Sequence, residues 1–182
     1  MKRKTPAKRK AATSRNRGTI KFVGLFVALS LTFYLAYYWL GGSFGFIRHN
    51  TAVVTGFFLS LVGMNTTVNT MGSDVILSVD GFSMNIIDEC TAAFSSIVYT
   101  SAVLAYPTIW KNKALGLVGI PILYGLNIIR LSVVAVVGIS HPDMFEYVHT
   151  YLWQAIFIIF VIGIFLLWIN RVVRKARQKI SS

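Results

Sequence analysis

Three residues of this chain could carry out chemistry together, and each belongs to a different apolar segment. Cys90, the only cysteine, opens one segment, Arg130 lies inside the next, and His149 precedes the last. A single thiol forms no internal disulfide and lacks the companion cysteines of a thiolate metal site. A thiol, a fixed positive charge and a titratable imidazole are, however, the parts of a site for acyl transfer through cysteine.

The composition is that of a membrane protein. Of the 182 residues, 55% are hydrophobic, and the mean hydropathy is +0.64. Nine of the 18 Lys and Arg residues lie in residues 2–21 and five in 171–179, whereas all six acids lie between these ends. This segregation indicates that both ends are cytoplasmic. The N-terminal arm has no interleaved aromatics, so we expect it to be disordered and to contact anionic lipid rather than nucleic acid.

Uncharged apolar runs predict the elements that position the three residues. Residues 22–40, 90–110 and 150–170 contain no charge, and residues 114–139 contain only Arg130. About 20 helical residues cross a hydrocarbon layer of about 30 Å, so we expect four transmembrane helices. The first run is interpreted as a retained span, because no small-residue cleavage site follows it and it is long for a signal peptide.

Two shorter features follow the first run. Residues 52–64 are apolar but short, and we expect an interfacial or re-entrant helix that does not cross the membrane. Residues 75–79 and 82–86 flank Asp80-Gly81, a strong signal for a β-hairpin. The expected fold is an all-α polytopic membrane protein with about four transmembrane helices, this short helix and a small extracytoplasmic hairpin.

The charge pattern places the three residues at one surface. The basic connector 111–113 should be cytoplasmic, so the acidic loop 143–146 and the hairpin face the other side. Cys90 and His149 then open their helices at the outer surface. Arg130 precedes the outer end of its run by nine residues, which puts it about 14 Å deep. Its flexible side chain can extend toward the surface, so the three groups can meet.

Each residue also has a simpler interpretation. A lone cysteine is often a small buried apolar residue, and His149 could be an interfacial side chain. Arg130 is harder to explain in this way, because a charge within a span costs about 2.5–3.5 kcal/mol on insertion scales and by default indicates function. Asn127 shares a helix face with Arg130. It could orient the guanidinium, donate to a substrate carbonyl or form an interhelical hydrogen bond.

The other two histidines are weaker candidates for a catalytic base. His141 precedes Pro142 and is expected to end a helix, whereas His149 begins a span. His49 has no evident partner. Because the histidines are separated and lack metal-ligand spacing, we expect neither a metal nor another cofactor.

The order of these motifs resembles the exosortase/archaeosortase family. The residues that carry the resemblance are Glu-Cys-Thr-Ala at 89–92, Asn-Ile-Ile-Arg at 127–130 and Phe-Glu-Tyr-Val-His at 145–149, together with the Asp-Gly hairpin before the cysteine. The resemblance covers roughly residues 20–170, and the short layout is most similar to the exosortase H type. The family often has glycine where this chain has Ala92.

Members of that family are membrane-embedded cysteine transpeptidases that process exported proteins bearing a C-terminal sorting tail. Such a tail consists of a short motif, a transmembrane helix and a basic end. The resemblance implies a bacterial inner-membrane enzyme whose site faces the extracytoplasmic side, with an unidentified acceptor. The implied catalytic residues are Cys90, Arg130 and His149, and the implied substrate-binding or supporting residues are Asn127, Glu89 and Thr91.

These expectations divide the chain into a cytoplasmic arm (1–21), a catalytic membrane domain (22–170) and a basic cytoplasmic tail (171–182). Asp88 is expected to cap the helix that follows it, which would place Cys90 in the first turn and favour its thiolate. The alternative is a non-catalytic membrane assembly or scaffold protein, which leaves Arg130 unexplained. A transporter is disfavoured because the sequence shows no internal repeat.

Overall fold

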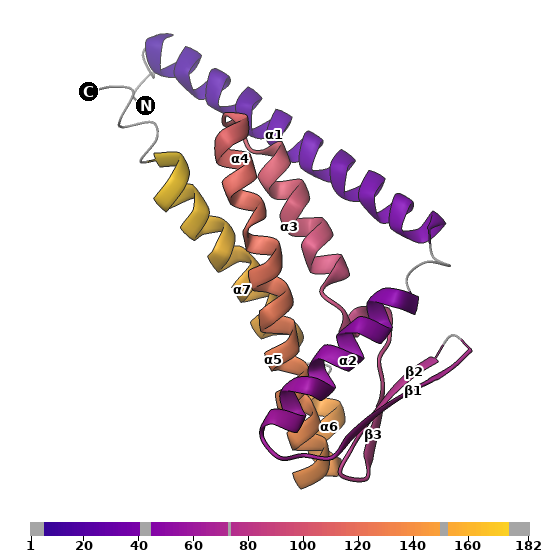
Figure 1. Cartoon of the computed structure of the whole chain (residues 1–182). Helices are drawn as coiled ribbons and strands as arrows, with labels where there is room; N and C mark the ends of the chain where they lie inside the picture. Colours follow the sequence, from indigo (N-terminus) through magenta and orange to yellow (C-terminus); the bar gives the residue numbers. More distant parts are fainter. Residues whose placement is uncertain (1–5, 41–44, 73, 150–152, 175–182) are drawn as a thin grey trace.

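The computed structural model describes residues 6–40, 45–72, 74–149 and 153–174. These residues form two halves, one of long helices and one built around a small antiparallel sheet (Figure 1). The helical half contains α1 (Pro6–Trp39), α3 (Ala93–Ala105), α4 (Trp110–Leu117), α5 (Gly119–Ser140) and α7 (Trp153–Trp168). The sheet half contains α2 (Gly45–Leu61), α6 (Pro142–Tyr147) and the strands. The start of α1 and the end of α7 lie at the end of the molecule opposite the sheet.

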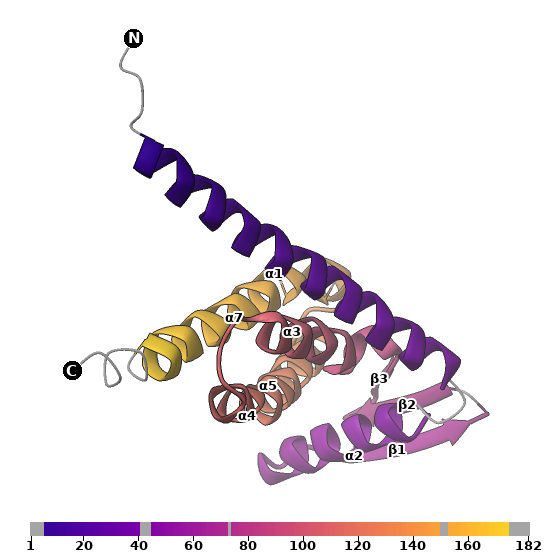
Figure 2. The ribbon, with the colours of Figure 1, turned by 90° about the horizontal axis from the view of Figure 1, so that it is seen from above.

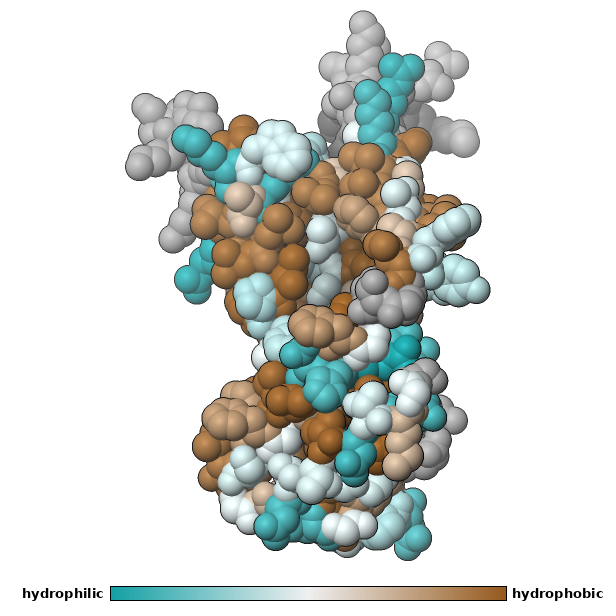
Figure 3. Space-filling view, turned by 45° about the vertical axis from the view of Figure 1, so that its right-hand side comes forward, coloured by the Kyte–Doolittle hydropathy of each residue, from teal (hydrophilic) through white to brown (hydrophobic). Residues whose placement is uncertain are grey.

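The helical half has the properties of a membrane domain. Among the described residues, three helices are long and apolar enough to cross a bilayer: Arg17–Trp39, Trp110–Ser140 and Ala155–Arg174. They correspond to three of the four predicted spans, although residues 150–152 of the last one lie outside the described residues. Apolar side chains cover much of this half, whereas the sheet half has a more polar surface (Figure 3). The chain is therefore a multi-pass helical membrane protein.

The remaining predicted span, residues 90–110, is only partly helical. Its helix α3 has 13 residues, which extend about 20 Å. α3 ends at Ala105 because Pro107 disfavours helical backbone in the residue before it, and Tyr106 is extended with φ −65° and ψ 131°. The helix is thus shorter than predicted at both ends.

α1 begins well before its apolar run. Because the helix starts at Pro6, the disorder expected for the N-terminal arm is wrong for residues 6–21, while residues 1–5 lie outside the described chain. Ala, Lys and Arg are good helix formers, and extending an existing helix requires no new nucleus. At the other end, a π-helical segment η4 (Ile169–Arg174) continues α7, and residues 175–182 of the predicted tail lie outside the described part.

The predicted hairpin is present. β2 (Asp74–Val79) pairs antiparallel with β3 (Phe82–Asn85). The φ angles of the turn are 44° at Asp80 and 88° at Gly81, the doubly positive combination that Asp-Gly favours. A third strand, β1 (Thr66–Met71), pairs with the other edge of β2. It was not predicted, because its threonines and asparagine produce no apolar face.

Helix α2 covers the sheet. It begins at Gly45 rather than residue 52, and it packs against β1, β2 and α5 (Figure 2). Gly56 allows the close approach, because a Cβ there would lie 3.3 Å from Leu77 Cδ1. The buried face of α2 consists mostly of small residues: Thr51, Ala52, Thr55, Gly56 and Leu59. This packing agrees with the expectation that the segment does not cross the membrane.

Two buried apolar clusters meet along α5. One joins the sheet and α2 to Leu131 and Ala135, and the other joins α3 and α7 to Leu123. Residues 110–140 form 31 residues of helix, about 47 Å in length, which exceeds a hydrocarbon layer of about 30 Å. The last turns of α5 pack on the sheet half. Arg130 lies at the junction of the two halves, within the candidate span Trp110–Ser140.

Candidate active site

A tight turn carries Cys90 from the sheet to α3. This 3-10 turn, η2 (Asp88–Cys90), is followed by Thr91, whose hydroxyl donates to the Asp88 carbonyl oxygen at 2.7 Å. The same hydroxyl accepts the Ala93 N–H at 3.3 Å, so Thr91 connects the turn to α3. The expected helix cap is wrong, since α3 begins at Ala93 without a side-chain cap. Cys90 therefore precedes the helix and is not in its first turn.

Asn127 fixes the backbone of Cys90. Its Nδ2 donates to the Cys90 carbonyl oxygen at 2.8 Å, and its side chain is fully buried. Of the three roles considered for Asn127, the structure contains the interhelical hydrogen bond. The bond ties η2 to α5 about one helical turn from Arg130. Asn127 therefore links the backbone of the cysteine to the helix that carries the arginine.

The thiol of Cys90 faces the imidazole of His149. Its Sγ lies 3.6 Å from His149 Nε2, and only 2% of the residue is exposed. Burial raises the pKa of the Cys90 thiol. The backbone of Ile87 and the positive charge of Arg130 lower this pKa in part, and Glu89 raises it. The resting group is thus a neutral thiol next to a possible proton acceptor, which suits general-base activation of the nucleophile.

An aromatic stack holds the imidazole in place. Phe145 lies parallel to His149, with ring centroids 5.5 Å apart and an interplanar angle of 4°. Phe82 of β3 contacts Phe145 edge-on, with centroids 5.1 Å apart. Gly138 of α5 leaves room for this ring, since a Cβ at that position would overlap Phe82. The sheet therefore positions the thiol through η2 and the imidazole through these two phenylalanines.

Arg130 lies on the other side of the cysteine turn. Its Nη1 donates to the Glu89 carbonyl oxygen over a long 3.5 Å, and its Cζ lies 5.9 Å from the centroid of the Phe157 ring. Only 8% of Arg130 is exposed, and its Nε has no hydrogen-bond partner among the described residues. A buried guanidinium with an N–H donor that has no partner is suited to bind an anionic group, or an oxyanion that forms during a reaction.

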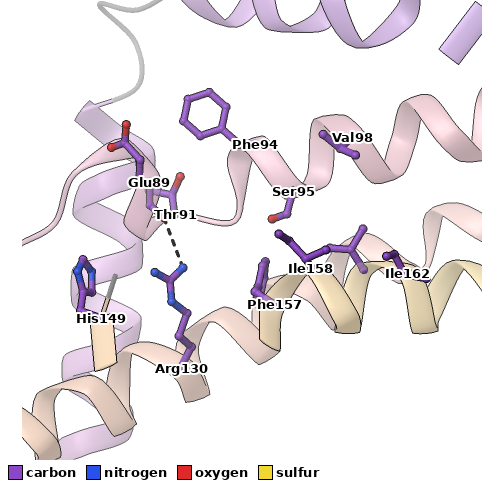
Figure 4. A pocket seen from close by; sticks show the side chains of 11 residues that line it. Glu89, Thr91, Phe94, Ser95, Val98, Arg130, His149, Phe157, Ile158 and Ile162 are labelled. Atoms are coloured by element: carbon purple, nitrogen blue, oxygen red, sulfur yellow. Dashed lines mark hydrogen bonds between the residues drawn. The ribbon is translucent and has the colours of Figure 1, made fainter. Parts of the chain in front are cut away.

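A cavity of about 600 Å³ opens beside these groups, between α3 and α7 (Figure 4). Its polar end is formed by Glu89, Thr91, Arg130 and His149. From there it continues along the two helices as an apolar surface lined by Phe94, Val98, Phe157, Ile158, Val161 and Ile162. A ligand that joins a polar group to an apolar segment matches this shape and chemistry.

The other two histidines lie away from the cavity lining. His141 is exposed at the junction of α5 and α6. His49 is also exposed, and its Nδ1 lies 3.1 Å from Thr70 Oγ1. Within the part of the chain that the structure describes, no group of three His, Cys, Asp or Glu side chains could hold a metal ion.

Three residues next to the site were missed in the sequence. Arg48 pairs with Asp88, with Nε and Oδ1 2.9 Å apart, but the two are 40 positions apart in the chain. Phe157 lies in a uniformly apolar run, so no local signal distinguishes it. Phe145 could have been found, because a residue four positions before His149 lies on the same face of a helix.

The fold and the site define a multi-pass helical membrane protein with a thiol, an imidazole and a guanidinium gathered at the junction of its two halves. The model of the transmembrane exosortase family matches residues 18–169, a range that contains the sheet and all three of these residues. The chain therefore belongs to the transmembrane exosortase family, as the order of its motifs predicted. No curated protein and no solved structure matches it significantly.

Proposed function

We propose that this protein is a membrane-embedded cysteine peptidase or transpeptidase that removes C-terminal sorting tails from exported proteins. The observation that carries the proposal is the 3.6 Å approach of Cys90 Sγ to His149 Nε2 beside the buried Arg130. Family membership supports the same reading. A scaffold protein would not require an imidazole and a guanidinium at the polar end of a cavity, with a buried thiol in contact with the imidazole.

The reaction follows from the positions of these groups. His149 Nε2 takes the thiol proton while Cys90 Sγ attacks the scissile carbonyl carbon, and Arg130 stabilises the oxyanion that forms. The C–N bond then breaks as the imidazolium returns the proton to the leaving amine. A thioester on Cys90 remains, and an incoming amine or water resolves it with His149 again accepting a proton.

The substrate's two chemical parts correspond to the two ends of the cavity. The scissile peptide would lie at Arg130 and His149, and the apolar residues that follow it would lie between α3 and α7. The basic chain ends support an orientation with the sheet-bearing end outside the cytoplasm, by the positive-inside rule. The site would thus act on the extracytoplasmic side of a bacterial inner membrane.

A chromosomal Cys90→Ala variant in the native host tests this function. Exported proteins with a motif, an apolar segment and a basic end should keep their C-terminal tails, as measured by mass spectrometry of C-terminal peptides from membranes. A Ser96→Ala variant in α3, the helix that follows the cysteine turn, serves as the control and should process the tails normally. Normal tail removal by a membrane-inserted Cys90→Ala protein would exclude Cys90 as the nucleophile.

A further inference from the structure

The turn that carries the thiol begins with a carboxylate, which on its own would oppose a cysteine nucleophile. Asp88 precedes Cys90 by two residues, and an uncompensated negative charge close to a thiol disfavours its thiolate form. The structure pairs this carboxylate with a cation from a different element: Arg48 Nε lies 2.9 Å from Asp88 Oδ1. Arg48 belongs to the first turns of α2, where the helix dipole also favours a negative group.

We propose that Arg48 is a positioning residue for Cys90, because it neutralises Asp88 and fixes the orientation of the 3-10 turn that presents the thiol. The proposal deepens the proposed function, since it concerns how that nucleophile is prepared. Arg48 acts through Asp88 and does not line the cavity. The backbone of the turn is then held from two directions, by the ion pair to α2 and by the Asn127 hydrogen bond to α5.

The ion pair between Arg48 and Asp88 is partly shielded from solvent. Both side chains are partly shielded, with 20% of Arg48 and 32% of Asp88 exposed. Tyr37 of α1 also lies against the Asp88 carboxylate. The Asp88 carboxylate thus interacts with side chains of α2 and α1 and does not cap α3. Without Arg48 the carboxylate would either remain charged beside the thiol or release the turn.

The charge balance around the thiol involves groups from each element packed against the turn. Asp88 and Arg48 compensate each other, while Arg130 favours the thiolate and Glu89 opposes it. The titratable and charged groups that surround Cys90 and its turn are Tyr37, Arg48, Asp88, Glu89, Arg130 and His149. Loss of Arg48 alone would leave one uncompensated negative charge in this set.

The single cysteine makes the test direct. Protein labelled with ¹³C at the cysteine Cβ gives one thiol signal, and its titration in detergent measures the pKa of Cys90 without any substrate. Arg48→Gln should raise this pKa by about 1, which lowers the thiolate fraction at neutral pH about tenfold. Arg48→Lys keeps the charge and should titrate like the wild type. Lys111→Gln, which removes an exposed charge at the start of α4, should also titrate like the wild type.

The double variant Arg48→Gln with Asp88→Asn decides the mechanism. It removes both charges, so the pKa of Cys90 should return to the wild-type value, whereas general loosening of the fold would not be reversed. An unchanged pKa in Arg48→Gln, or a rise that Asp88→Asn does not reverse, would overturn the proposal. The titration needs no tail cleavage, so its result stands apart from whether Cys90→Ala abolishes processing.

Discussion

The side-chain amide of Asn127 donates a hydrogen bond to the backbone carbonyl of Cys90, over 2.8 Å, from the adjacent helix. This bond links the two elements that carry the thiol and the guanidinium. Because Asn127 is fully buried, water could not take its place as the donor to the Cys90 carbonyl oxygen. The order of Cys90, Asn127 and Arg130 in the chain thus corresponds to a physical connection between the nucleophile and its cation.

Replacing Asn127 with leucine should disrupt both stability and activity. The substitution leaves the Cys90 carbonyl without its buried donor, which costs about 1–3 kcal/mol of unfolding free energy. Thermal unfolding in detergent measures this loss, and tail removal should slow because η2 is no longer held. Ser132→Ala, which removes the Oγ donor to the Ile128 carbonyl on the same helix, is the matched control. If Asn127→Leu and Ser132→Ala showed the same thermal stability and the same rate of tail removal, the role assigned to Asn127 would be contradicted.

Gly138 and Gly125 form a matched pair on α5. A Cβ at Gly138 would overlap the Phe82 ring, whereas nothing lies within 4 Å of one at Gly125. Gly138→Ala should cost about 1–3 kcal/mol through overpacking and should slow tail removal, because Phe82 supports the stack on His149. Gly125→Ala should be neutral or more stable by up to about 1 kcal/mol. If both variants retain wild-type activity and stability, the stack does not position the imidazole.

The reactivity of Cys90 should depend on pH in a defined direction. Burial raises the pKa of the thiol, so alkylation by iodoacetamide should still increase with pH where an ordinary cysteine has levelled off. Arg130 lowers this pKa, so Arg130→Gln should move the profile to higher pH, whereas Arg130→Lys should shift it less. Loss of an oxyanion donor should also reduce tail removal about 10²–10³-fold. A shift to lower pH in Arg130→Gln would contradict the electrostatic role.

Sidedness can be tested with single cysteines placed on a Cys90→Ala background. Met71 on β1 is 70% exposed and Trp110 at the start of α4 is 75% exposed, so both positions are accessible. A membrane-impermeant maleimide should label Met71→Cys in intact inner-membrane spheroplasts and Trp110→Cys only after permeabilisation. The reverse pattern would invert the orientation inferred from the basic ends.

Local chemistry made part of the fold predictable. The Asp80-Gly81 turn was found because only a few residue types accept positive φ at both central positions. The segregation of Lys and Arg predicts that Cys90 and His149 lie at the same end of their helices, and the two side chains are in contact. β1 was not found, because the pattern of polar residues in Thr66–Met71 does not distinguish a sheet edge from a loop.

The parts of the site that could not be predicted depend on contacts between distant segments. Asp88 was expected to cap a helix, since nothing near it in sequence indicates that Arg48 would bind it. Phe157 is one of many apolar residues in the last span, and only packing selects it as the neighbour of Arg130. The packing of the last turns of α5 on the sheet was not predicted either, because an apolar run does not show which part of a helix packs on protein.

The central claim is that Cys90 forms a thioester with the exported protein, and intact mass spectrometry of the acid-quenched enzyme tests it most directly. Wild-type protein from the native host should carry an adduct that maps to the Cys90 peptide and is released by neutral hydroxylamine. Cys90→Ala should carry no such adduct while uncleaved tails accumulate. Tail removal at the wild-type rate with no adduct on Cys90 would contradict the account.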